Sequence, residues 1–295
     1  MADTHTETAD GNAVQTLIFR TFDLSSLLRL VFRRVKGGLF LAAALLALAH
    51  SPMAKAEVFY GVTGNGIYSV DSVSGGPATL LVTFAAPLAS GATLATRPSD
   101  GMLFYLDTQA ANPNLWRWDP STPAVSPVLI GTPGATTVGV IRLGFDVAGN
   151  LFAMNSGAGS SLWTLDPATG AILSVTPASG YLGGNLPGGG DLCLHPATGV
   201  LYMVAQTNLF TVNSTGLVTL VGAMTGLPGS ATGCAFDRNG KLAVSPGATL
   251  YTVNLGTLVA TAMPVAAGVA FGDLATNPNA NIVADLRLKI GRAHV

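Results

Sequence analysis

Residue types that could carry out catalysis are scarce between residues 57 and 285 of this 295-residue sequence. His195 is the one histidine in that stretch, and Glu57 is its one glutamate. A single histidine rules out a histidine-rich metal site, although it could serve a Ser–His–Asp triad. No G-x-S-x-G nucleophile motif accompanies it. His195 occupies the Asp or Asn position of a turn, followed by Pro, Ala, Thr and Gly, so we interpret it as a turn residue.

Aspartate is the remaining candidate for acid–base chemistry. Hydrolysis by paired carboxylates would need two of them, because no second glutamate is present. Five of the ten aspartates in this stretch stand in repeated turns, where an Asx side chain caps its own backbone. These turn residues are Asp71, Asp119, Asp146, Asp166 and Asp237. Asp191 and Asp273 fall instead at the start of short apolar segments.

The charges of this stretch argue against a polyanionic partner. Residues 57–285 contain eleven acidic and five basic residues, a net charge of −6, and the basic ones form no stripe. Nucleic-acid binding depends on clustered Lys and Arg. We therefore exclude nucleic acid as a partner.

The elements that must position these residues repeat along the chain. Five segments pair Leu or Ile with an aromatic residue, at steps of 48, 47, 47 and 41 residues; the aromatic residues are Tyr68, Trp116, Trp163, Phe210 and Tyr251. Each segment is preceded by an apolar run and followed by an Asx turn and one more run, and every unit except the first also has a leading run before these. Four short strands at a period of 41 to 50 residues are typical of a β-propeller blade.

The two ends of the repeat predict how the ring closes. The first unit begins directly at Val58 and lacks a leading strand, whereas residues 268–278 resemble a leading strand with no unit behind it. Joining the two predicts an all-β propeller of five four-stranded blades. A sixth, degenerate blade within residues 175–189 is the alternative.

Alignment of the five leading strands predicts a candidate site. It places Thr93, Arg142, Asp191, Gly233 and Asp273 at equivalent positions. Leading strands line the central channel of a propeller. Arg142, Asp191 and Asp273, with Thr93 beside them, could therefore hold a small polar ligand or a cation such as calcium. The alternative is a solvated channel mouth with an Asp–Arg pair.

The two cysteines, Cys193 and Cys234, lie in leading strands of neighbouring units. When the strands are aligned on Leu194 and Phe236, the cysteines are offset by one residue. Side chains one residue apart point to opposite faces of a strand. We therefore predict two buried free thiols rather than a disulfide.

The N-terminal 56 residues predict export. Arg33, Arg34 and Lys36 precede a dozen apolar residues, which end in Ala54-Lys55-Ala56. This pattern is a secretory signal peptide, and the apolar run is shorter than the roughly 18 to 20 residues that span a bilayer. We expect cleavage after Ala56 and an extracellular or cell-surface location, with the periplasm or outer membrane as alternatives and no membrane span afterwards. An uncleaved anchor is the other interpretation, and a start codon near Val31 or Val35 would explain the long leader.

Residues 57–280 resemble the uncharacterised bacterial propeller-like domains that precede tandem immunoglobulin-like repeats in surface proteins. The strand–turn motif L-[FYW]-x-[LV]-[DN] carries this resemblance, and residues 281–289 are similar to the opening of such a surface repeat. The resemblance implies a non-enzymatic recognition, adhesion or structural module, followed by further repeat domains. An extracellular glycan or protein would be its ligand. The alternative function is a propeller hydrolase, lactonase or lyase with its site in the channel.

The last six residues, 290–295, fit neither the blades nor the following repeat. Written as codons, IGRAHV can be ATCGGAAGAGCACACGTC, which resembles a sequencing adapter. We therefore expect residues 281–289 to begin a truncated domain and residues 290–295 to be an artefact.

Overall fold

A computed structural model describes residues 57–276, apart from 73–75, 86, 89–91, 108–112, 135–138 and 182–184. The predicted leader, the region after residue 276 and the domain boundary at 280 lie outside the described residues. Within those residues, no helix is long and apolar enough to cross a membrane.

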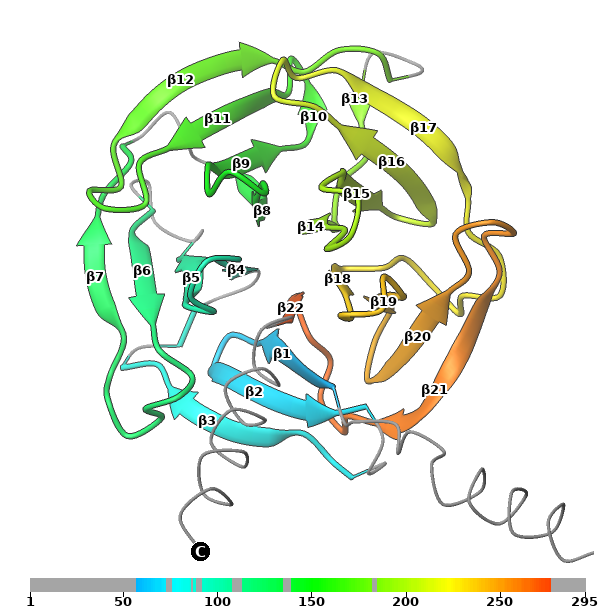
Figure 1. Cartoon of the computed structure of the whole chain (residues 1–295), viewed down its shortest axis with the longest axis horizontal. Helices are drawn as coiled ribbons and strands as arrows, with labels where there is room; N and C mark the ends of the chain where they lie inside the picture. Colours follow the sequence, from blue (N-terminus) through cyan, green and yellow to red (C-terminus); the bar gives the residue numbers. More distant parts are fainter. Residues whose placement is uncertain are drawn as a thin grey trace, which may run out of the picture. The chain divides into compact units, whose positions relative to one another are not determined.

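The described chain is an all-β propeller of five four-stranded antiparallel blades, as the repeat predicts (Figure 1). In each blade the four strands lie side by side, from an inner strand at the channel to an outermost strand at the rim. The inner strands are β22 (Asp273–Thr276), β4 (Thr93–Thr96), β8 (Val140–Phe145), β14 (Asp191–Leu194) and β18 (Gly233–Phe236). The second strands are β1 (Val58–Val62), β5 (Leu103–Leu106), β9 (Leu151–Asn155), β15 (Leu201–Ala205) and β19 (Leu242–Ser245).

The outer half of each blade completes the sheets. The third strands are β2 (Gly66–Asp71), β6 (Leu115–Trp118), β11 (Ser161–Leu165), β16 (Asn208–Val212) and β20 (Thr249–Val253). The outermost strands are β3 (Thr79–Thr83), β7 (Val128–Gly131), β12 (Ile172–Pro177), β17 (Val218–Ala223) and β21 (Ala260–Ala266).

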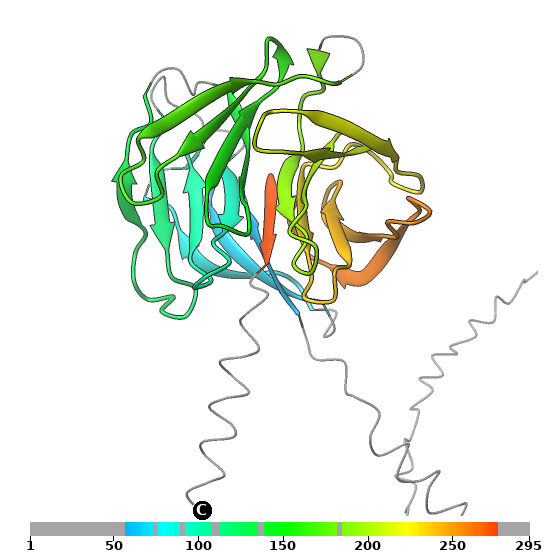
Figure 2. The same ribbon diagram turned by 45° about the horizontal axis from the view of Figure 1, so that its top comes forward.

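The ring closes through β22, which lies within residues 268–278, the predicted leading strand with no unit behind it. β22 pairs with β1, with Phe59 opposite Thr276 and Val62 opposite Asp273. The sheet order is β22-β1-β2-β3, so the first blade combines the two ends of the propeller. Figure 2 shows β22, in red, upright at the centre of the ring. This confirms the predicted closure.

The region considered for a sixth blade has another structure. β10 (Gly157–Ala158) and β13 (Asn185–Leu186) form a separate two-stranded sheet that links the third and fourth blades. The described part of residues 175–189 therefore provides the end of β12 and a short extension, and the blades number five.

Apolar residues fill the space between successive blades. The core separates into five clusters, each drawn mainly from two neighbouring blades, and Phe104 contacts Phe145 across one such boundary with ring centroids 5.1 Å apart. The inner strand β18 and the second strands β5 and β19 are buried along their whole length, which is why these segments read as continuous apolar runs rather than alternating ones.

Candidate functional site

The five aligned residues meet at one end of the channel. Thr93, Asp191, Gly233 and Asp273 are the first residues of their inner strands, and Arg142 is the third residue of β8. We call this end of the channel the entry face. The opposite end, where Thr96, Phe145, Leu194, Phe236 and Thr276 end the inner strands, is the exit face.

Glycine lets the chain bring Asp191 to the channel. Gly190 has a φ of +87°, and a Cβ atom there would lie 1.8 Å from the carbonyl oxygen of Val204. Only glycine can make this close turn into β14. Gly233 fills the fifth position for a related reason, because a Cβ there would lie 2.5 Å from the backbone nitrogen of Leu274. The channel has no room for a fifth side chain at this level.

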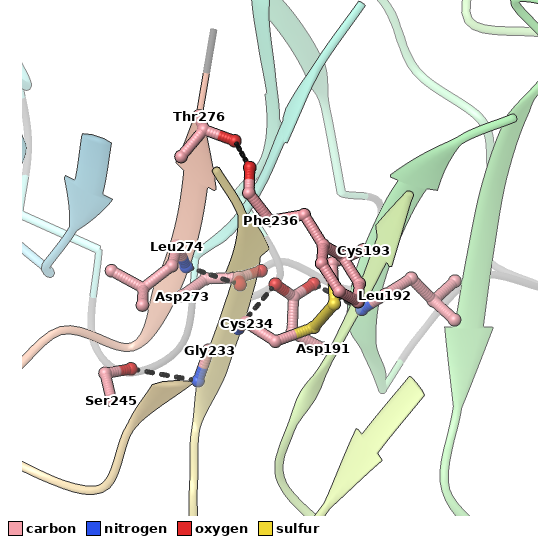
Figure 3. Close-up of a disulfide and its surroundings, with 10 residues drawn as sticks. All are labelled: Asp191, Leu192, Cys193, Gly233, Cys234, Phe236, Ser245, Asp273, Leu274 and Thr276. Carbon is pink, nitrogen blue, oxygen red and sulfur yellow. Dashed lines mark hydrogen bonds between the residues drawn. A yellow bond between two sulfur atoms is a disulfide. The ribbon is translucent and has the colours of Figure 1, made fainter. Parts of the chain in front are cut away.

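The two carboxyl groups are buried and face one another (Figure 3). Asp191 is 0% exposed and Asp273 is 1% exposed. Desolvation raises the pKa of Asp191 to about 7. Desolvation, together with the charge of Asp191, raises the pKa of Asp273 well above its usual value. The raised pKa of each carboxyl therefore disfavours two negative charges on this buried pair.

Backbone amides occupy the carboxyl oxygens. Asp273 accepts from the N–H of Leu94, at 2.9 Å, and from that of Leu274, at 2.7 Å. Asp191 accepts from the N–H of Leu192, at 2.6 Å, and from that of Cys234, at 3.1 Å. It also accepts from the N–H of Leu143. These five amides, one from each inner strand, form what we call the upper amide ring: Leu94, Leu143, Leu192, Cys234 and Leu274.

The upper amide ring explains why two carboxyl groups are buried here. An inner strand has a partner strand on one side only, so alternate amides on its other edge face the channel unpaired. Asp191 and Asp273 satisfy all five of these amides at one level and tie the inner strands to one another. The structural role of the pair is therefore visible in its contacts.

Arg142 is fully buried beside this pair. Its guanidinium donates to the backbone carbonyls of Asn155, at 2.9 Å, and Gly189, at 2.6 Å, and also to that of Pro187. Burial lowers the pKa of Arg142 to about 10, and the charges of Asp191 and Asp273 oppose that shift. Its Nε has no described hydrogen-bond partner. Arg142 thus anchors the 187–190 segment over the entry face of the channel.

These contacts do not fit a bound calcium ion. Calcium takes six to eight oxygen ligands, whereas the described carboxyl oxygens of the pair already face N–H donors. The three carbonyls that could contribute further oxygens surround the guanidinium of Arg142. No cluster of three or more metal-ligating side chains occurs among the described residues. The alternative of a solvated Asp–Arg mouth also differs from the structure, since all three side chains are buried.

The prediction of free thiols is wrong. Cys193 and Cys234 form a disulfide between β14 and β18, with Cα atoms 5.8 Å apart (Figure 3). The one-residue offset does place the two side chains on opposite faces of their own sheets. In a ring of blades, however, one face of each blade packs against the opposite face of the next. Opposite faces in neighbouring blades are therefore the arrangement that brings two side chains together.

His195 lies in the turn after β14, as its surroundings in the sequence indicate. Its Nδ1 accepts from the N–H groups of Ala197, at 3.3 Å, and Thr198, at 3.2 Å. The carboxylate of Asp166 makes the equivalent contact with Ala168 at 2.8 Å. The ring of His195 also packs on Phe236, with centroids 4.8 Å apart. The imidazole thus takes the place of an Asx side chain in this turn.

Comparison with known proteins informs us about the fold of this chain and not about its chemistry. No protein-family model matches the chain, and no curated protein sequence matches it significantly. A protein of unknown function from Bacteroides thetaiotaomicron has a similar fold, with a TM-score of 0.50 and 13% identity over 74% of this chain. The chain spans 64% of that protein's length.

Two further structures are similar at lower scores. A protein of unknown function from Bacteroides caccae has a TM-score of 0.42 and 14% identity, over 70% of this chain and 72% of its own. An engineered GH43 glycoside hydrolase has a TM-score of 0.48 and 13% identity, over 66% of this chain and 45% of its own. At these identities only the fold is comparable.

Proposed function

We propose that this chain is a non-enzymatic recognition or adhesion module, exported as part of a larger bacterial surface protein. One observation carries the proposal. The described residues that most resemble a catalytic cluster, Asp191 and Asp273 with Arg142, are buried and bonded to backbone groups. They hold the propeller together, so binding by its surface is the better-supported activity.

For hydrolysis or lyase chemistry, Asp191, Asp273 and Arg142 would have to be accessible to a substrate. A general acid or base must come within hydrogen-bond reach of the substrate. Asp191 and Asp273 are 0% and 1% exposed, and Arg142 holds the 187–190 segment over them. A substrate would have to displace this segment and compete with five amides. The alternative of a propeller hydrolase, lactonase or lyase is therefore less well supported.

The disulfide supports export. Disulfides persist in oxidising compartments and are rare in reducing ones. Cys193 and Cys234 join two blades, which fits a protein that folds after secretion. The signal peptide that the sequence predicts would deliver it there.

The ends of the propeller support a role within a longer chain. Glu57, just before β1, and Thr276, at the end of β22, lie at the exit face on paired strands. Connections to neighbouring domains would therefore leave from one face. The loops at the entry face would then be free to meet an extracellular glycan or protein.

The exported full-length chain provides the test. It is screened against bacterial and host glycans, extracellular proteins and whole cells, and in parallel against glycoside, lactone and polysaccharide-lyase substrates. We expect specific binding without turnover. Turnover that is lost in the Asp191→Asn/Asp273→Asn double variant, while circular dichroism shows an intact fold, would overturn the proposal.

A further inference from the structure

Below the upper amide ring the five inner strands enclose a cavity of about 210 Å³ that opens at the exit face. Every inner strand contributes to its wall, and Pro98, Val147 and Pro196 contribute at the mouth. None of the described lining residues carries an ionisable side chain, since the two lining cysteines are joined in the disulfide. An engineered cavity of roughly 150 Å³ holds a benzene molecule, so this one has room for a group of single-ring size.

Strand geometry places a second set of amides in this cavity. In an antiparallel pair, residues alternate between those that bond to the partner strand and those whose N–H and C=O point away from it. The upper amide ring belongs to the second kind, so residues two positions further on face the channel as well. We call these the lower amide ring: Thr96, Phe145, Leu194, Phe236 and Thr276.

None of the described residues that line the cavity offers the lower amide ring a carboxyl group. All five of its residues line the cavity. The hydroxyl of Thr276 donates to the carbonyl of Phe236, which shows that a backbone carbonyl at this level is open to a hydrogen-bonding group from a neighbouring blade. The cavity wall therefore offers N–H donors and C=O acceptors in the same plane.

This wall favours an uncharged ligand. A buried ion without a counter-charge is costly, and the lining offers no counter-charge for either sign. The upper ring shows which group the channel backbone accepts, since its N–H groups bond to the planar carboxyl of Asp273. An amide group is also planar; its carbonyl oxygen accepts from N–H groups, and its own N–H can donate to a carbonyl.

We infer that the cavity at the exit face is a binding site for a small uncharged amide, and that it takes the acetamido group of an N-acetylated sugar. The amide carbonyl accepts from the lower amide ring, and its N–H donates to a channel-facing carbonyl. The methyl group and the sugar ring contact Pro98, Val147 and Pro196. This inference gives the proposed glycan recognition a ligand class and a second binding surface, the cavity at the exit face besides the entry-face loops, and to that extent rests on the proposed function.

Nuclear magnetic resonance tests the site directly on the exported chain. Titration with N-acetylglucosamine is expected to shift the amide signals of the lower amide ring more than those of any other residues. Glucose lacks the amide, and protonated glucosamine carries a charge in its place. Both are expected to bind at least roughly tenfold more weakly. Glucose would leave N–H and C=O groups of the cavity wall without a hydrogen-bond partner, and glucosamine would bury a charge without a counter-charge.

Two matched variants separate the cavity from the rest of the surface. Val147 is 71% exposed at the mouth, and Leu173 is 65% exposed on the outermost strand β12. Val147→Trp narrows the mouth and is expected to abolish the shifts, whereas Leu173→Trp leaves them unchanged. Neither side chain is part of the core, so both variants are expected to fold.

The outcomes distinguish this inference from the proposed function. Equal shifts with glucose, shifts centred elsewhere, no shifts, or full binding by Val147→Trp would each overturn the cavity assignment. If another glycan or a protein still binds the entry face of that variant, the proposed function stands without the cavity. Turnover of N-acetylglucosides that depends on Asp191 and Asp273 would instead overturn the proposed function.

Discussion

Asp191 and Asp273 bind the backbone amides of all five inner strands, which couples the protonation of this pair to the stability of the fold. Both have a raised pKa, chiefly because burial disfavours the charged form. A carboxyl whose pKa is higher in the folded state stabilises the fold below the unfolded pKa, near 4. That contribution is lost as the pH rises through the folded pKa, which is about 7 for Asp191.

We therefore expect the propeller to be most stable in mild acid. The melting temperature should fall by roughly 5 °C or more between about pH 5 and pH 8. Asp273→Asn should flatten this profile, because the amide cannot ionise. Asp166→Asn is the control, since Asp166 is exposed and hydrogen bonds to Thr169 and Ala168 lower its pKa. Thermal unfolding followed by circular dichroism across this pH range gives the melting temperatures of the wild type and both variants. A melting temperature of the wild type that rises or stays constant with pH would contradict the raised pKa of the buried carboxyl pair.

Arg142 is expected to matter through its three carbonyl contacts rather than through a ligand. Arg142→Met keeps much of the volume but leaves these three part-buried carbonyls without their donor, at about 1–3 kcal/mol for each one that water does not reach. We expect the free energy of unfolding to fall by about 3 kcal/mol or more in urea titrations. Arg142→Lys should lose less, because an ammonium can still donate. Equal stability of the methionine variant and the wild type would show that the guanidinium is dispensable.

The disulfide joins the inner strands β14 and β18, which belong to different sheets and share no β-sheet hydrogen bonds. It closes a loop with a sequence separation of 41 residues. Loss of a disulfide of this kind costs about 2–4 kcal/mol. We expect Cys193→Ser/Cys234→Ser to unfold at correspondingly lower urea concentrations. Reductant should lower the stability of the wild type and leave that of the double variant unchanged. Insensitivity of the wild type to reductant under unfolding conditions would count against the bond.

Contacts within a blade could be predicted from the sequence, and contacts between blades could not. A blade is made of strands that follow one another along the chain and are joined by short turns. Its pattern of apolar runs, aromatic residues and Asx turns is therefore local in sequence, and an aromatic residue such as Trp163 or Phe210 identifies its third strand. The Cys193–Cys234 bond and the Asp191 contact with Cys234 depend on how one blade stacks on the next. Aligning the strands identified Asp191, Asp273 and Arg142 as neighbours. It could not show their burial, because the 187–190 segment and the upper amide ring have no sequence signal of their own.

The whole ring depends on one short strand contributed from the other end of the chain. β22 lies against β18 and β4 of the two neighbouring blades and pairs with β1 of its own blade. Leu274 is 1% exposed in the cluster that also holds Phe59 and Phe271. Asp273 supplies the hydrogen bond that ties β4 to this strand. Without β22 the ring would have an open channel wall and an unpaired edge on β1.

We therefore expect a chain that ends at Gly272 to lose cooperative unfolding, whereas a chain that ends at Thr276 keeps it. Both lack everything that follows the propeller, so the four residues of β22 are their sole difference. Leu274→Ala in the longer chain gives an intermediate case, with a loss of about 2–5 kcal/mol expected for a buried leucine. A synthetic peptide spanning residues 268–276 should restore a sharp transition to the shorter chain by pairing with β1. Calorimetry measures each step, and a cooperative transition of the shorter chain without peptide would mean that the other four inner strands close the ring unaided.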